Sequence, residues 1–308
     1  MRERPDGMRR RAACAGLAVA LTVGWTASAC GGPGQLPDTR PSCAAPLRPG
    51  GSSPLLRQSW IISAGALVQL QQAGLPARLF QNFDRPGTLV LVSHGRPDSL
   101  VRRASPTLYF TSEATMASAL RGGRVARSVR YLLLDLERWP LTPGSEQRNP
   151  IGALRSAVSV AHAHGKCLVF APAIDLVGVQ HPGTGGPALY SLFDSSIAGP
   201  GAALADVFVV QSQHSEGTSY ANSLAPQAIG AARAAHRVPV LAGLSTSPNG
   251  HHVSPADLLA VYRASVHGGG AGFWLNIPQS DAECSRCGLP QPQVAVAFLE
   301  AAAGNTAG

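Results

Sequence analysis

Short apolar runs that alternate with helical patterns constrain the fold of this chain more than any other feature. Seven such runs follow residue 87, and they span residues 88–92, 108–110, 131–136, 167–170, 206–210, 238–242 and 271–275. Helical patterns lie between several of them, notably at 151–164, 221–235 and 255–267. Continuous apolar strands that alternate with helices predict a parallel sheet with both faces covered.

An eighth apolar run at 60–62 precedes these seven. Eight strand–helix units predict an α/β fold, a single (β/α)8 TIM-like barrel over residues 58–303. The alternative is an open doubly wound sheet, which favours a Gly-rich phosphate-binding turn after the first strand. The sequence has no G-x-G-x-x-G there, so the barrel is the favoured interpretation.

The first 29 residues have the layout of a secretory signal peptide, with three Arg at 9–11, an apolar run at 12–26 and small residues before Cys30. This segment resembles a bacterial lipoprotein signal. The resemblance implies cleavage before Cys30 and acyl chains, such as palmitate, attached there. An ordinary signal peptide cut near Ala29 is the alternative. The Gly- and Pro-rich stretch 30–57 is predicted to be a flexible, disordered tether, and 304–308 a disordered tail.

The chain carries a formal charge of +8, and its only lysine is Lys166. The signal region accounts for part of this charge, with five Arg against Glu3 and Asp6, which leaves +5 for the rest. The remaining Arg residues are scattered through the sequence, without the aromatic residues that accompany nucleic-acid binding. We therefore expect a monomer whose partners are membrane lipid, through the N-terminal anchor, and a glycan. The expected location is the extracytoplasmic face of the cell membrane.

Cysteine usage fits export into an oxidising compartment. Cys284 and Cys287 are close enough for a redox motif, half of a zinc site or a local disulfide, and the disulfide is favoured. Zinc would need a companion pair of ligands, which the sequence lacks, so we expect no metal and no cofactor. The sequence leaves open whether Cys43 and Cys167 pair.

Two acids end the apolar run at 131–136. Asp135 and Glu137 are two residues apart, so on a strand they point the same way, with α-carbons about 6.6 Å apart. The C-terminal end of a barrel strand is where such folds hold their catalytic groups. We expect Glu137 to be the general acid of a glycoside hydrolase and Asp135 to raise its pKa by repulsion. The second catalytic group would be Asp175 or the N-acetyl group of the substrate.

Other polar and aromatic residues lie at or just after the ends of the predicted strands. Amides and carboxylates bind sugar hydroxyls and an indole stacks on a sugar face, so the predicted substrate-binding residues are Trp139, Asp175, Gln211, Gln213, Trp274 and Asn276. His94 and Glu113 lie at the same end. Glu146 is predicted to cover the site or to belong to a turn. Asp206 begins its strand and is expected to be a cap or a surface charge at the opposite end.

The segment Asp135-Leu136-Glu137 resembles the D-x-E of barrel-fold glycosidases, including chitinase-like and cell-wall lysozyme-like enzymes. The chitinase pattern has two further aspartates upstream, whereas this strand has none before Asp135. Over residues 58–303 the chain resembles bacterial secreted lipoproteins with a glycosidase-like barrel. The resemblance implies hydrolysis of a cell-wall or environmental glycan. A catalytically inactive carbohydrate-binding or scaffolding lipoprotein is the alternative, and metal-dependent phosphodiester cleavage is a third possibility.

Overall fold

The computed structural model describes residues 43, 55–92, 99–220, 222–235, 238–280 and 288–304. The chain divides into two units, Met1–Thr39 and Arg40–Gly308, and all the described residues belong to the second unit. The predicted signal peptide, the predicted lipidation site Cys30 and the predicted disulfide pair Cys284 and Cys287 lie outside the described residues.

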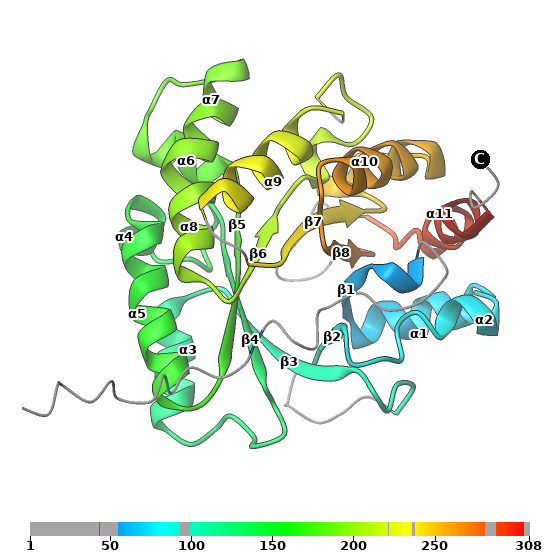
Figure 1. The fold of residues 1–308 in the computed structure, drawn as a ribbon, viewed down its shortest axis with the longest axis horizontal. Coiled ribbons are helices and arrows are strands. Elements are labelled where there is room, and N and C mark those ends of the chain that lie inside the picture. Colours follow the sequence, from blue (N-terminus) through cyan, green and yellow to red (C-terminus); the bar gives the residue numbers. More distant parts are fainter. Residues whose placement is uncertain are drawn as a thin grey trace, which may run out of the picture. The chain divides into compact units, whose positions relative to one another are not determined.

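Eight parallel strands form a closed barrel in which each strand pairs with its neighbours in chain order (Figure 1). The strands are β1 Ser59–Ser63, β2 Thr88–Leu91, β3 Ser105–Phe110, β4 Tyr131–Leu136, β5 Cys167–Pro172, β6 Val207–Val210, β7 Val240–Ser245 and β8 Gly272–Asn276. Because all strands run the same way, their carboxyl ends form one rim of the barrel, the C-terminal face, and their amino ends form the N-terminal face.

Pairing between the first and last strands closes the barrel. Trp60 in β1 pairs with Phe273 in β8, and the backbones approach closely at Gly272. A β-carbon added to Gly272 would lie 2.1 Å from the carbonyl oxygen of Ser59, so this seam requires glycine. The predicted (β/α)8 barrel is confirmed, and the open doubly wound sheet is wrong.

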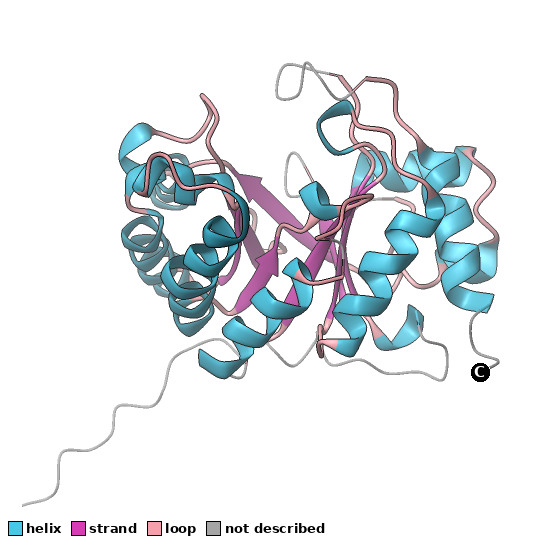
Figure 2. Ribbon diagram, turned by 90° about the horizontal axis from the view of Figure 1, so that it is seen from above, coloured by secondary structure: helices cyan, strands magenta, loops and turns pink. Residues whose placement is uncertain are grey.

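Helices surround the strands, as the view from above shows (Figure 2). The α-helices are α1 Ala64–Gln72, α2 Ala77–Phe80, α3 Glu113–Arg121, α4 Gly144–Arg148, α5 Pro150–Ala163, α6 Asp175–Gln180, α7 Gly186–Phe193, α8 Gly199–Leu204, α9 Leu224–Ala235, α10 Pro255–His267 and α11 Pro292–Gly304. Ser254 and Asp257 form a capping box that starts α10 at the predicted residue. Within the described part of the chain, no helix combines the length and apolar character needed to span a membrane.

The strands are apolar on both faces because each face is covered. One set of side chains fills the barrel interior, including Ile61, Leu133, Val169 and Trp274. Their sequence neighbours, such as Ile62 and Leu132, pack outward against the helices. Residues two apart on a strand therefore share the interior, and this alternation directs Asp135, two residues after Leu133, into the barrel.

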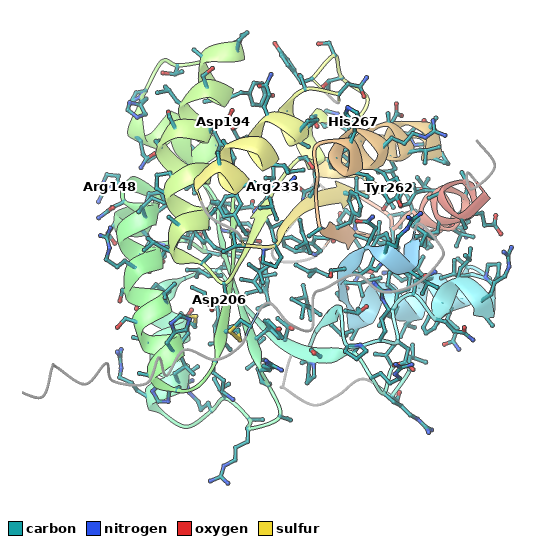
Figure 3. The ribbon with its side chains drawn as sticks, viewed as in Figure 1. Arg148, Asp194, Asp206, Arg233, Tyr262 and His267 are labelled. Carbon is teal, nitrogen blue, oxygen red and sulfur yellow. A yellow bond between two sulfur atoms is a disulfide. The ribbon has the colours of Figure 1, made fainter. Side chains whose placement is uncertain are left out.

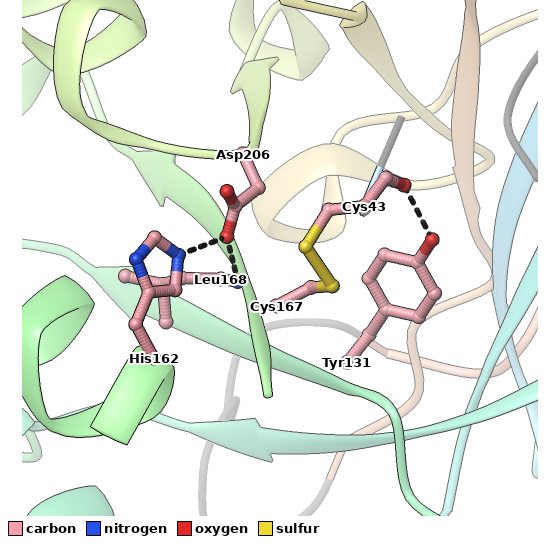
Figure 4. Close-up of polar contacts among 6 residues, drawn as sticks. All are labelled: Cys43, Tyr131, His162, Cys167, Leu168 and Asp206. Atoms are coloured by element: carbon pink, nitrogen blue, oxygen red, sulfur yellow. Dashed lines mark hydrogen bonds and ion pairs between the residues drawn. A yellow bond between two sulfur atoms is a disulfide. The ribbon is translucent and has the colours of Figure 1, made fainter. Parts of the chain in front are cut away.

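A disulfide joins Cys43 to Cys167, the first residue of β5, across 124 positions of sequence. The hydroxyl of Tyr131, the first residue of β4, donates to the carbonyl oxygen of Cys43 at 2.6 Å (Figure 4). Both contacts lie at the N-terminal face. The chain that precedes the barrel is thus covalently and non-covalently fixed there at Cys43.

Asp206 lies beside this disulfide (Figure 3). Its Oδ2 accepts a hydrogen bond from the backbone N–H of Leu168 at 2.7 Å and pairs with His162 Nε2 at 2.8 Å. The predicted structural role for Asp206 at the end opposite the rim acids is confirmed.

Candidate active site

Asp135 is buried near the end of β4 and is held by two donors. The hydroxyl of Tyr109 in β3 donates to its Oδ2 at 3.0 Å, and Nε2 of Gln211 donates to its Oδ1 at 2.6 Å. The side chain is only 2% exposed. Burial raises the pKa of Asp135 well above its usual range, the charge of Glu137 adds to this, and the two hydrogen bonds oppose it. The contacts fix the direction of the carboxyl group.

Glu137 is the second residue after Asp135 and follows the last residue of β4. Its backbone N–H donates to Thr142 Oγ1 at 3.3 Å, and that hydroxyl donates in turn to the carbonyl oxygen of Thr111 at 2.9 Å. The loop after β4 is thereby tied to the loop after β3. Burial and, next, repulsion by Asp175 raise the pKa of Glu137 to about 7, and a hydrogen bond from Gln211 opposes the rise.

Asp175 begins α6, three residues after β5 ends. Its Oδ1 accepts a hydrogen bond from the backbone N–H of Arg138 at 3.1 Å. The charge of Asp175 also raises the pKa of Asp135, as a smaller contribution than burial. Carboxyl groups from two adjacent strand ends therefore act on one another electrostatically, which is the arrangement that separates the protonation of neighbouring acids.

Gln211 organises this group of acids. It follows β6, and its Nε2 donates to the carbonyl oxygen of Ala171 at 2.8 Å as well as to Asp135. Both amide hydrogens are thus engaged within the protein. The structure places Gln211 with the acids, where it orients Asp135, rather than presenting a free amide donor.

Tyr109 was not identified from the sequence. Its side chain points into the barrel. In the pairing of β3 with β4, Tyr109 lies opposite Leu133, which is two residues before Asp135. Alternation of side chains along β3 could have placed a tyrosine on the interior face, one strand away from the acids. Using that signal requires the register between the strands, which the sequence does not provide.

Gln213 lies against β7 inside the barrel. A β-carbon added to Gly243 would lie 2.4 Å from Gln213 Oε1, so the glycine makes room for the amide. Gln213 is 8% exposed, and its Oε1 has no hydrogen-bond partner among the described residues. A buried acceptor without a protein partner is suited to a donor from water or from a ligand.

Glu216 is a further buried acid, which the sequence pattern did not indicate as a site residue. It follows the short helical turn Gln213–Ser215, and its Oε1 accepts a hydrogen bond from the backbone N–H of Ser245 at 2.8 Å. Its Oε2 has no hydrogen-bond partner among the described residues. Burial raises the pKa of Glu216 well above its usual range. An acid in the loop after an apolar strand was the available signal.

The two predicted tryptophans and Asn276 differ in their surroundings. Trp274 is 6% exposed and belongs to the interior core, where it pairs in register with Gly243. Asn276 ends β8 and is partly exposed. Trp139 is partly buried, and its Nε1 donates to Thr142 Oγ1 at 2.8 Å. Trp139 therefore lies in the loop that carries Glu137, whereas Trp274 forms part of the barrel interior.

Glu146 neither covers the site nor simply forms a turn. Its carboxylate accepts hydrogen bonds from Ser112 Oγ at 3.0 Å and from the backbone N–H of Glu113 at 2.8 Å. It thus caps the N-terminus of α3. The Glu113 carboxylate accepts from Ser156 Oγ in α5 at 2.8 Å, so both acids are engaged between helices. His94 lies outside the described residues.

One group of candidate metal ligands occurs among the residues that the structure describes. Ligand atoms of Cys43, Cys167 and Asp206 lie within 4.8 Å of one another. The two sulfurs are joined as a disulfide, so neither is a thiolate that could bind zinc. In this state the group is structural.

We expect the Glu216→Gln substitution to change how stability depends on pH. The raised pKa means that the folded state holds this proton more tightly than the unfolded chain does. The stabilisation is complete below the unfolded pKa and is lost as pH rises through the folded pKa, at about 1.4 kcal/mol per unit of difference. Gln keeps an acceptor for Ser245 and cannot ionise.

Urea unfolding at pH 5, 7 and 9 would measure this effect. The free energy of unfolding of the variant, relative to that of the wild type, should increase as pH rises. Glu300→Gln, at an exposed position in α11, is the matched control and should leave the pH dependence unchanged. Parallel curves for wild type and Glu216→Gln would show that Glu216 has an ordinary pKa.

Comparison with known proteins finds no matching family model and no similar curated protein. Structural neighbours include glycoside hydrolases. The catalytic domain of a family GH18 chitinase from the fern Peteris ryukyuensis has 18% identity, with 69% of this chain and 72% of that chain covered and a TM-score of 0.36. A class V chitinase from Pseudomonas fluorescens has 11% identity, coverage of 78% and 98%, and a TM-score of 0.42.

Pyruvate carboxylase from Rhizobium etli is also similar, at 14% identity and a TM-score of 0.37, with 80% of this chain but 21% of that chain covered. These identities and TM-scores are too low to indicate an activity.

Proposed function

We propose that this protein is a glycoside hydrolase anchored outside the cytoplasmic membrane, with Glu137 as general acid and Asp135 as its partner. The observation that carries the proposal is the carboxyl group of Glu137 at the C-terminal face, with a pKa of about 7. A general acid works best when its pKa lies near the working pH, because it is then both protonated and able to give up its proton.

The neighbouring acids have different parts in this proposal. Glu137 donates its proton to the oxygen of the scissile glycosidic bond. Asp135, oriented by Tyr109 and Gln211, is its neighbour on the same strand, and the charge of Glu137 helps to raise the pKa of Asp135. Asp175 is the candidate second group, because it lies on the next strand end and acts electrostatically on Glu137. An N-acetyl group of the substrate is the other candidate for that role.

Export and anchoring rest on the sequence and on one structural observation. The signal-like segment before Cys30 predicts cleavage and lipidation. The disulfide between Cys43 and Cys167 supports an oxidising compartment, since such bonds are rare in the cytosol. A cell-wall or environmental glycan is the substrate class that fits this location.

A hydrolysis screen over peptidoglycan, chitin, β-glucans and mannans tests the activity. Release of reducing ends from one of these polymers is the expected result. Tight binding to a glycan without hydrolysis would instead favour a catalytically inactive carbohydrate-binding protein.

The pH dependence of kcat/KM provides a sharper test through Asp175→Asn. Glu137 must be protonated to act, so activity should fall as pH rises through about 7. Removing the Asp175 charge should lower the pKa of Glu137 and move the alkaline limb of the remaining activity to lower pH, while Asn keeps an acceptor for the Arg138 N–H. Glu300→Gln should leave the limb in place. An unmoved limb in Asp175→Asn would contradict the assignment of Glu137 as the titrating acid.

A further inference from the structure

Four arginines gather in one connection of the barrel. Residues 121–130, here called the arginine loop, run from the last residue of α3 to the residue before β4. They contain Arg121, Arg124, Arg127 and Arg130 and no acidic residue. All four are exposed. Because the loop leads into the amino end of β4, it lies at the N-terminal face, at the bottom of Figure 1.

The protein holds this loop in one arrangement and adds a further cation to it. Lys166 Nζ donates to the carbonyl oxygens of Val129 at 2.6 Å and Ala126 at 3.2 Å. Arg124 Nη2 donates to Ser118 Oγ at 2.9 Å. Arg130 lies 5.8 Å from the centre of the Tyr131 ring. The exposed arginines therefore lie on a loop that is fixed by side-chain hydrogen bonds.

The arginine loop lies next to the point where the chain enters the barrel. Tyr131 follows Arg130 directly and donates to Cys43, and Lys166 precedes Cys167, the disulfide partner of Cys43. The acid in this neighbourhood, Asp206, is paired with His162. The fold thus places this cluster of positive charge near Cys43, which follows Cys30 by 13 positions.

We propose that the arginine loop binds the anionic headgroups of a lipid bilayer, so that the N-terminal face lies on the membrane and the acids of the C-terminal face point away from it. A cluster of basic residues is attracted to anionic lipid, by about five-fold in partitioning for each Arg near the surface. Thirteen residues extend at most about 45 Å, so an anchor at Cys30 would keep the loop within reach of the bilayer. The loop contains no aromatic residue, which makes a nucleic acid a poorer match.

Cosedimentation of the full chain with vesicles tests this docking. Binding to vesicles that contain phosphatidylglycerol and phosphatidylcholine in a 3:1 ratio should exceed binding to vesicles of pure phosphatidylcholine. Binding to the pure phosphatidylcholine vesicles measures any contribution of the N-terminal anchor. The triple variant Arg121→Gln, Arg124→Gln, Arg127→Gln should lose on the order of 10- to 100-fold of that excess. Raising the salt concentration from 50 to 300 mM should weaken wild-type binding.

A second triple variant with the same change in net charge is the control. Arg78→Gln, Arg155→Gln, Arg263→Gln removes exposed arginines of the outer helices α2, α5 and α10 and should keep most of the excess binding. Equal losses in both variants would overturn the proposal, because net charge would then explain the binding. So would an unchanged excess in the arginine-loop variant.

Hydrogen exchange identifies the face that meets the bilayer. Amides of residues 121–130 should be protected by the anionic vesicles, and amides of 137–143, at the C-terminal face, should not. The opposite pattern would overturn the orientation. None of these measurements uses hydrolysis, so the docking can fail or succeed independently of the proposed activity.

Discussion

Glu137→Gln should lower kcat on a hydrolysed glycan by roughly 10²- to 10⁴-fold, the range that a positioned general acid contributes. Gln has nearly the same shape but has no proton to donate to the leaving oxygen. KM should change little, because the side chain still occupies the same place. Since the charge of Glu137 raises the pKa of Asp135, the variant should also leave Asp135 easier to ionise.

Glu113→Gln is the matched control for this substitution. Glu113 is a glutamate of the same type, and its carboxylate is engaged by Ser156 rather than directed at the acids of the C-terminal face. It should keep full activity. Hydrolysis at the wild-type rate by Glu137→Gln would remove Glu137 from the mechanism, and the same loss in Glu113→Gln would indicate a general effect on folding.

Replacing both Cys43 and Cys167 with Ser should lower the free energy of unfolding by about 5 kcal/mol, the loop-closure value for a disulfide that spans 124 positions. The bond limits the unfolded chain most strongly when the loop it closes is long. The substitution also removes the covalent attachment of position 43 to β5, which weakens the hydrogen bond from Tyr131 to the carbonyl oxygen of that position. The loss is comparable with the whole stability of many domains.

Urea unfolding of the oxidised wild type and the double variant measures this loss as a lower transition midpoint. Cys284→Ser, Cys287→Ser is the control, because a bridge there would close a loop of only a few residues and should contribute less. Addition of a reductant during unfolding should shift the wild type and leave the Cys43→Ser, Cys167→Ser variant nearly unchanged. Equal midpoints for the oxidised wild type and that variant would contradict the prediction.

Much of the fold could be predicted because its determinants are local. The run at 131–136 is apolar except for Asp135 because both faces of a barrel strand are buried, and the same reason applies to the runs at 167–170 and 240–242. Ser254, Pro255 and Asp257 mark the start of α10 by capping chemistry alone. Strand order and closure follow less directly, and the pairing of β1 with β8 needed the structure.

The candidate site divides in the same way. The spacing of Asp135 and Glu137 placed both side chains on one face of β4, since alternation along a strand is a property of the backbone. Tyr109 and Glu216 were missed, and Gln211 was expected to bind substrate rather than to orient Asp135. Their positions depend on register between strands and on the path of the loop after β6.

The sequence by itself determined the strand–helix alternation, the location of two acids at a strand end, and the export-like beginning of the chain. Only the tertiary structure decided that Cys43 pairs with Cys167, that Asp175 acts on Glu137, and that Lys166 and Cys43 lie next to the arginine loop. The reason is physical. Periodicity and capping depend on residues that are close in sequence, whereas closure of the barrel brings together side chains that are tens to more than a hundred positions apart.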